Sequence, residues 1–256
     1  MQPATPEEMF ELVHGVRSDD PSWFEFGDRV LTPDDIVAIL KPRISESRLV
    51  TIERVLAART NDVTVVVEGM VDLGNVSAVM RSAEGFGVQS FHAIDTADAY
   101  KRSRRTTRGT DKWLDRYRWS DVDSCFGFLR SHGYRVVIAT VGDELVPIGE
   151  ADLSERIALV FGNELDGVSM RARELSDLAI TIPMAGFAES FNVSVAASVA
   201  LYETRAQRTR RYGSVGSMDE VERDRVRAVW YLKSVRESRL VVERALRDGH
   251  QPAGTM

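Results

Sequence analysis

The pattern of hydrophobic and polar positions changes character after Asn61. Before this residue, apolar positions recur every three or four residues, as in amphipathic helices, whereas short β-branched runs alternate with helical patterns after it. This alternation is typical of an α/β domain with a mainly parallel sheet. The apolar runs predict strands at Val63–Glu68, Val88–Ile94, Tyr134–Val141, Ile157–Phe161 and Leu178–Ile182.

Helical patterns fill much of the remaining chain. Thr5-Pro6 and Thr32-Pro33 each combine an N-cap threonine with proline at the first helical position, and acidic residues follow in the first turn. Further helices are predicted at Arg43–Arg59, Val76–Phe86, Asp123–His132, Ser169–Asp177, Ser190–Arg211 and, as one final helix, Met218–Arg247. We therefore expect an acidic helical extension over residues 1–42, an α/β domain over 43–216, and a C-terminal helix and tail over 217–256.

Composition narrows the class of protein and of chemistry. Of the 256 residues, 43% are hydrophobic and 28% are charged, which is typical of a soluble globular protein. The single cysteine, Cys125, excludes an intrachain disulfide and favours a reducing, cytoplasmic setting, and the four histidines lack metal-ligand spacing. Pro183 and Glu189 interrupt the most apolar long stretch, and the start lacks a signal-peptide pattern, so we expect no membrane association and no metal.

Charge is unevenly distributed along the chain. The formal net charge of −6 argues against a nucleic-acid partner, but residues 1–40 hold nine acidic residues against two basic ones. In contrast, residues 101–118 hold eight basic residues against two acidic ones. This run is either a solvated loop or a loop that faces phosphates. The candidate RNA-binding residues within it are Arg102, Arg104, Arg105, Arg108 and Lys112.

Three segments at predicted strand ends have the composition of a binding site. In the first, Asn75 can cap the helix that follows, and Arg81 projects away from that helix's apolar stripe, where it could meet an anion. The alternative is an exposed helix charge that pairs with Glu84 or Glu164. The second segment, 157–169, runs from a strand through a glycine-flanked turn that carries Glu164.

The third segment, 180–200, passes from a strand through a loop with proline and glycine into a helix of small residues. Small residues let a ligand or another backbone approach closely. The alternative is a tightly packed core helix, in which Ser190 and Asn192 only cap the orphan N–H groups.

Together, the three segments resemble the motifs of the SpoU-type (TrmH) family of SPOUT RNA methyltransferases. They read N-V-S-A-V-M-R-S-A, V-F-G-N-E-L-D-G-V-S and I-P-M-A-G-F-A-E-S-F-N-V-S-V-A-A. The resemblance implies a parallel sheet with helices on both faces, a deep C-terminal trefoil knot, a homodimer and S-adenosyl-L-methionine as cofactor. It implies catalytic roles for Asn75, Arg81, Glu164, Ser190 and Asn192, and cofactor contacts from Thr140, Gly162, Ile182 and Phe191.

The activity implied by this resemblance is 2′-O-methylation of a tRNA guanosine, at position 18 in the D-loop. Arg81 would stabilise the developing alkoxide and position a phosphate, and Asn75 and Glu164 would hold Arg81 in place. Arg208 matches an RNA-binding arginine of the family. The chain departs from the family at 72–74, where Asp-Leu-Gly replaces a common Lys-Pro-His. An rRNA 2′-O-methyltransferase and a non-catalytic RNA-binding factor with the same fold are the alternatives.

Overall fold

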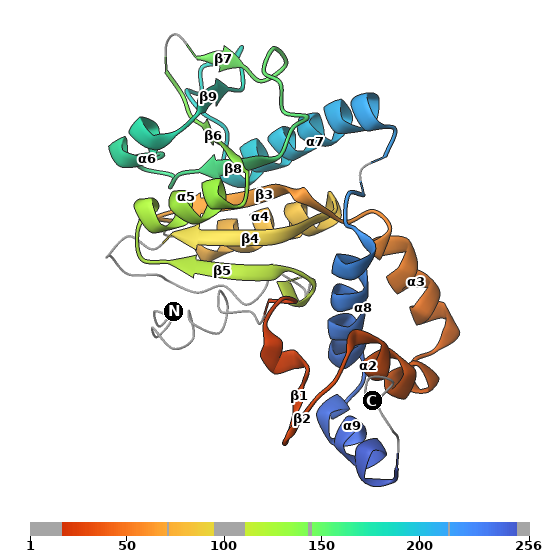
Figure 1. Cartoon of the computed structure of the whole chain (residues 1–256). Coiled ribbons are helices and arrows are strands. Elements are labelled where there is room, and N and C mark those ends of the chain that lie inside the picture. Colours follow the sequence, from red (N-terminus) through yellow and green to blue (C-terminus); the bar gives the residue numbers. More distant parts are fainter. Residues whose placement is uncertain (1–16, 71, 95–110, 143–144, 215, 250–256) are drawn as a thin grey trace. The chain divides into compact units, whose positions relative to one another are not determined.

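The computed structural model describes residues 17–70, 72–94, 111–142, 145–214 and 216–249 (Figure 1). These residues form two compact units. Unit 1 contains the described residues from 60 to 214, and unit 2 contains residues 17–59 together with 216–249. Among the described residues, no helix combines the length and the apolar character that a membrane span requires.

Unit 1 is built on a seven-stranded sheet in which every strand pair is parallel. The strand order is β5 (Asp115–Trp119), β4 (Val88–Ile94), β3 (Thr60–Glu68), β8 (Ile157–Phe161), β6 (Arg135–Ala139), β9 (Leu178–Thr181) and β7 (Val146–Pro147). The predicted α/β class with a mainly parallel sheet is confirmed. The trefoil knot stays a prediction.

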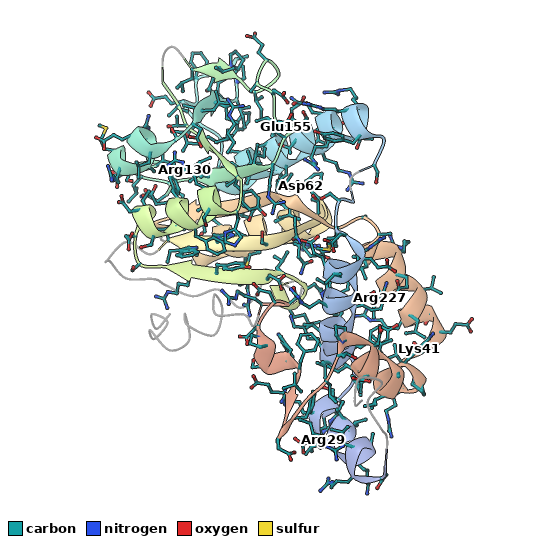
Figure 2. The ribbon with its side chains drawn as sticks, in the orientation of Figure 1. Arg29, Lys41, Asp62, Arg130, Glu155 and Arg227 are labelled. Carbon is teal, nitrogen blue, oxygen red and sulfur yellow. The ribbon has the colours of Figure 1, made fainter. Side chains whose placement is uncertain are left out.

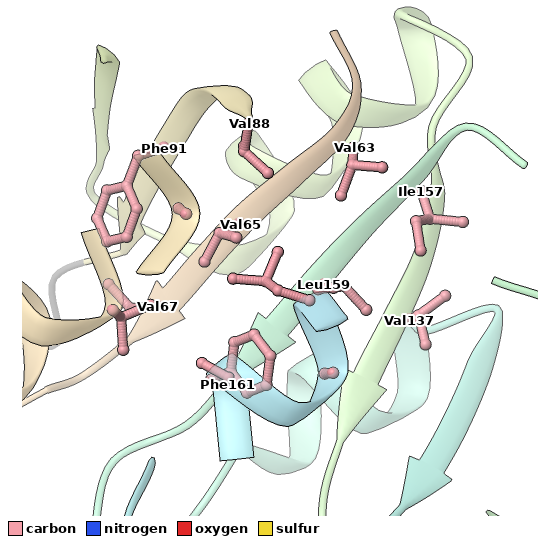
Figure 3. Close-up of a cluster of buried hydrophobic side chains, with 14 of the residues drawn as sticks. Val63, Val65, Val67, Val88, Phe91, Val137, Ile157, Leu159 and Phe161 are labelled. Carbon is pink, nitrogen blue, oxygen red and sulfur yellow. The ribbon is translucent and has the colours of Figure 1, made fainter. Parts of the chain in front are cut away.

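Helices cover both faces of this sheet, which explains why the central strands are continuous apolar runs. Val65 and Leu159 point to a core shared with α4 (Leu73–Gly85) and α7 (Val193–Tyr212), as Figure 3 shows for the strand residues. Val66 and Val160 point to the opposite core, beneath α5 (Val122–Ser131) and α6 (Met170–Leu175). Alternate residues of one strand therefore fill two different cores.

The five predicted strands are present, and two further strands of unit 1 were not predicted. Strand β7 has only two residues, and β5 lies at the edge of the sheet within the charged run 101–118. The end of that run is therefore a strand and not a loop, which corrects the prediction. Arg116 and Arg118 of β5 are half-buried, because the strand pairs with β4 along its length. A short 3-10 helix, Asp111–Trp113, precedes it.

One buried histidine lies in the strand next to the edge of the sheet. His92 of β4 stacks on Tyr117 with ring centroids 4.4 Å apart, and its Nδ1 accepts a hydrogen bond of 3.0 Å from Nε1 of Trp119. Burial, together with a smaller effect of the charge of His132, lowers the pKa of His92 to about 3. The imidazole is therefore neutral in the folded protein, which its role as an acceptor requires.

Unit 2 combines segments from the two halves of the chain. It contains α2 (Pro33–Leu40), α3 (Glu46–Leu56), α8 (Glu220–Ser234) and α9 (Ser238–Arg247), the 3-10 helices Pro21–Trp23 and Lys41–Arg43, and a hairpin of β1 (Glu25–Phe26) and β2 (Arg29–Val30). Thr32 caps α2 as predicted, in a capping box with Asp35. The helix predicted after Thr5 lies outside the described residues.

The single final helix predicted for Met218–Arg247 is wrong. Helix α8 ends at Ser234, Val235 is extended, and Glu237 adopts a left-handed conformation with φ of 53° before α9 begins. The break allows α9 to pack against α2 and to bury Val242 and Leu246. Neither proline nor glycine marks this break in the sequence, so local composition could not predict it.

The structural division also falls elsewhere than the predicted boundary at residue 42. Helix α3 belongs to unit 2, because it packs against α8, the helix that carries Arg227 (Figure 2). Nε of Arg227 donates to Oε1 of Glu53 in α3 at 2.7 Å. The described residues of unit 2 hold fifteen acidic and fifteen basic side chains. The acidic excess of its N-terminal part is therefore balanced by basic residues elsewhere in unit 2.

Candidate active site

A cavity of about 500 Å³ opens where three neighbouring strands of unit 1 end. Thr140 follows β6, Gly162 follows β8 and Ile182 follows β9, and the carboxyl ends of parallel strands share one edge of the sheet. The cavity is lined by all four predicted cofactor residues, Thr140, Gly162, Ile182 and Phe191, and by three of the predicted catalytic residues, Glu164, Ser190 and Asn192.

The loop after β8 forms one wall of this cavity, and it is folded tightly against itself. Asn163 and Gly167 exchange two backbone hydrogen bonds of 3.1 Å. Oδ1 of Asn163 also accepts from the backbone N–H groups of Leu165 at 2.8 Å and of Asp166 at 2.7 Å. A Cβ at Gly162 would lie 1.9 Å from the carbonyl carbon of Gly167. Only glycine fits at residue 162 while the loop keeps this path.

Three predicted catalytic residues are joined in one hydrogen-bonded chain beside the cavity. Nδ2 of Asn75 in α4 donates to Oε1 of Glu164 at 2.5 Å, and Nδ2 of Asn192 donates to Oδ1 of Asn75 at 3.2 Å. Asn192 is the N-cap of α7, and its Oδ1 accepts from the backbone N–H of Ser194 at 2.9 Å. Residues far apart in sequence are thus fixed relative to one another.

Asn75 does not cap α4, contrary to the prediction. The N-cap is Asp72, whose Oδ1 accepts from the backbone N–H of Gly74 at 2.7 Å. Asn75 lies inside the first turn, so its side chain is available to bind Glu164 and Asn192. Asp72, which is one of the residues at 72–74 that differ from the family pattern, therefore supplies the cap of α4. Ser169 caps α6, since its Oγ accepts from Ala172 N–H at 3.1 Å.

Arg81 lies on the exposed side of α4 and lines a second cavity, of about 510 Å³, between α4 and α7. Its side chain forms no hydrogen bond or ion pair with any described residue, including Glu84 and Glu164. The expectation that Asn75 and Glu164 hold Arg81 in place is therefore wrong for this structure, because these two side chains bind each other. Its guanidinium is available for an anion.

The predicted RNA-binding residues fall into three groups. Arg102, Arg104, Arg105 and Arg108 lie outside the described residues. Lys112 is exposed, with its Nζ 4.5 Å from the ring centroid of Trp113. Arg208 is buried, donates to Oδ2 of Asp62 at 2.7 Å and also binds two backbone carbonyl oxygens. We therefore assign Arg208 a structural role, which corrects its inclusion among the RNA contacts.

Several residues at the site were not predicted. Asp166, Arg173 and Glu189 line the first cavity. Glu68, at the end of β3, is buried and its Oε2 accepts from the backbone N–H of Ser169 at 3.0 Å, which fixes the end of the 163–169 loop. For a helical residue such as Arg173, the periodicity of the sequence shows that the charged side chain is exposed but not which cavity it faces. For Glu68, the only signal in the sequence is its position at the end of an apolar strand.

The sequence that forms this site is similar to that of a known protein family. The model of the SpoU rRNA Methylase family matches residues 62–202, which include both the cavity loop and the Asn75–Glu164–Asn192 chain. The chain belongs to the SpoU rRNA methylase family. Among its relatives in the SpoU family, the tRNA (guanosine(18)-2′-O)-methyltransferase of Thermus thermophilus is 36% identical over 65% of this chain and 86% of the relative.

The similarity extends to further SpoU relatives and to their solved structures. The tRNA (guanosine(18)-2′-O)-methyltransferase of Aquifex aeolicus is 30% identical over 78% of this chain and 96% of its own length. The crystal structure of a TrmH/SpoU tRNA modifying enzyme from A. aeolicus has a TM-score of 0.68, at 30% identity, over 75% of this chain and 98% of that one. The SpoU methyltransferase AviRb from Streptomyces viridochromogenes, in complex with the cofactor AdoMet, has a TM-score of 0.53 at 28% identity, over 62% and 64%.

Proposed function

We propose that this SpoU family member is an S-adenosylmethionine-dependent tRNA (guanosine-18) 2′-O-methyltransferase. The observation that carries the proposal is the coincidence of the strand-end cavity with the Asn75–Glu164–Asn192 chain. Residues from three separate segments form one continuous site, and the relatives named for this activity match along most of the chain. A tRNA substrate also implies a cytoplasmic enzyme.

The first cavity suits the cofactor in size and in construction. Small-molecule sites commonly measure about 300 to 1,000 Å³, and this cavity falls within that range. Its lining joins apolar side chains, such as Ile182 and Phe191, with polar groups of the 163–167 loop. S-adenosylmethionine, when bound, supplies an electrophilic methyl group. The cofactor would be held by Gly162, Thr140, Ile182 and Phe191.

Arg81 would act on the RNA and not on the cofactor, because it lines the second cavity and not the first. A ribose 2′-hydroxyl must lose its proton during methylation, and charge develops on its oxygen. The guanidinium of arginine would have to lose its own proton before it could act as a base, and it does not do so readily. Its positive charge would instead stabilise the developing alkoxide and bind a phosphate. The Asn75–Glu164–Asn192 chain would keep the loop and α7 in register with α4. Ser190 would shape the loop before α7.

The second cavity also suggests a partner, and we propose a second copy of this chain. Its rim contains side chains that are unusually exposed for apolar residues, namely Val195 at 45%, Val199 at 36% and Tyr202 at 64%. Contiguous apolar surface of this kind marks an interaction site. Light scattering should give the mass of a dimer, and Val199→Glu should reduce it to that of a monomer.

The activity is tested with an unmodified tRNA transcript and a labelled methyl donor. We expect the label in 2′-O-methylguanosine at position 18, and no transfer to a transcript with 2′-deoxyguanosine at that position, because it lacks the acceptor hydroxyl. Methylation of rRNA alone would identify the rRNA enzyme instead. Binding of S-adenosylhomocysteine in calorimetry without transfer to either RNA would identify a non-catalytic factor.

A further inference from the structure

Arg173 of α6 lines the first cavity without a carboxylate partner among the described residues. Its Nη2 donates to the hydroxyl of Thr140 at 2.7 Å, and its side chain forms no other hydrogen bond or ion pair with the described residues. Two nearby arginines of unit 1 behave differently. Arg171, two residues earlier on the same helix, pairs with Asp123 and Glu174, and Arg130 pairs with Asp177.

A neutral hydroxyl satisfies little of what a guanidinium can bind. The group has five N–H donors in a planar fork and a permanent positive charge, and it matches a carboxylate in two parallel hydrogen bonds. Only one donor of Arg173 is used by a described residue. The Thr140 bond orients the guanidinium at the cavity wall and leaves donors for an anion.

The same cavity also carries negative charge on other segments. Glu164 and Asp166 come from the loop after β8, and Glu189 comes from the loop before α7. A ligand with one carboxylate and separate cationic groups would complement this lining. The amino-acid tail of S-adenosylmethionine has that pattern, because it carries a carboxylate, an ammonium group and the sulfonium.

We propose that Arg173 binds the carboxylate of the cofactor's amino-acid tail, and that Thr140 positions its guanidinium. This inference rests on the proposed function, since it assigns one end of the proposed cofactor. It makes Arg173 a specificity-determining residue that distinguishes the complete cofactor from adenosine derivatives without the tail. An RNA phosphate is a less suitable partner, because Arg173 lines the strand-end cavity and not the α4–α7 surface that carries Arg81.

The test compares two ligands that differ in the tail. S-adenosylhomocysteine has the amino acid, whereas 5′-methylthioadenosine keeps the adenosine and the thioether but lacks it. Because hydrogen bonds between charged groups are strong, calorimetry should show that Arg173→Ala weakens S-adenosylhomocysteine binding by about tenfold or more. Binding of 5′-methylthioadenosine should stay within about twofold, since the ligand cannot reach Arg173 through a carboxylate.

Matched variants separate this effect from a general one. Arg171→Ala removes the same charge from the same helix and should change neither affinity. Arg173→Lys keeps the charge and should restore part of the loss for S-adenosylhomocysteine. Thr140→Val removes the hydroxyl that orients Arg173 and should weaken S-adenosylhomocysteine by less than Arg173→Ala does.

Three results would overturn the inference alone, while the wild type still binds S-adenosylhomocysteine. The first is an unchanged affinity of Arg173→Ala for S-adenosylhomocysteine, and the second is an equal loss of affinity for S-adenosylhomocysteine and 5′-methylthioadenosine. The third is a loss of tRNA binding only, which would make Arg173 a phosphate contact. If the wild-type protein binds neither nucleoside, the proposed function itself fails. The two failures are therefore distinguishable.

Discussion

Replacing Gly162 by alanine should damage the cavity more than any other single methyl group added to the site. The new Cβ would lie 1.9 Å from the carbonyl carbon of Gly167, 2.0 Å from its oxygen and 2.1 Å from the nitrogen of Val168. All three are backbone atoms, so no side-chain rotation can relieve the overlap. Real Cβ atoms essentially never approach closer than 3.0 Å, so the loop must move by about 1.1 Å.

The substitution should lower both the stability of the domain and the rate of the reaction, because Glu164 lies in the displaced loop. Overpacking of this kind costs about 1–3 kcal/mol. For a domain of this size, each kcal/mol lowers the unfolding midpoint by about 2–4 °C, so a decrease of about 2–12 °C is expected. The same displacement moves Glu164 away from Asn75, and a misplacement of about 1 Å can reduce a reaction rate about 100-fold.

Differential scanning calorimetry, S-adenosylhomocysteine titration and the methyl-transfer assay together measure these effects. Gly149→Ala is the matched control, because an added Cβ there meets no atom within 4 Å and the residue is exposed. The control should match the wild type in all three measurements. Wild-type stability and affinity in Gly162→Ala would show that the loop does not follow the described path, and our account of the cavity would be refuted.

Three further predictions follow from other parts of the molecule. Arg81→Ala should abolish methyl transfer while the unfolding midpoint and S-adenosylhomocysteine affinity stay unchanged, because the side chain has no described partner to lose; a loss of stability instead would indicate a structural role. Since burial holds the pKa of His92 at about 3, the unfolded chain takes up a proton below about pH 6.5 that the native protein does not, so stability falls as the pH decreases from 6.5 toward 3. His92→Phe should flatten that part of a pH series of thermal midpoints, and an equally steep profile would refute the assignment. Thr32→Ala should cost about 1–2 kcal/mol in urea unfolding, because it removes the capping box of α2, and a cost near zero would contradict that geometry.

The most buried elements were predicted best. Strands β4 and β8 match their predicted bounds to the residue, because apolar side chains on both faces leave a continuous run in the sequence. Strand β5 was missed because it is an edge strand in which charged and aromatic residues alternate. The two-residue strand β7 is too short to produce a pattern.

The site could be predicted only through the resemblance to a family. Asn75 and Glu164 are 89 residues apart, and Asn75 and Asn192 are 117 apart, so no local periodicity links them. Local rules failed where tertiary contacts decide. They assigned the cap of α4 to Asn75 instead of Asp72. The resemblance itself failed at Arg208, which it placed on RNA although Asp62 holds this side chain inside the protein.

Unit 2 is built from two segments that lie far apart in the sequence, and this has a consequence for synthesis on the ribosome. Helix α2 packs against α8, and the Arg227–Glu53 and Arg239–Ser22 contacts join residues 174 and 217 positions apart. At about 5–20 residues per second, α8 is translated roughly 10–40 s after α2. Until then the apolar face of α2, with Ile36 and Leu40, has no α8 to cover it, whereas the described residues of unit 1 all lie between 60 and 214 and can fold as they emerge. We therefore expect nascent chains stalled before Asp219 to be held by chaperones or degraded, even when their catalytic unit is already complete.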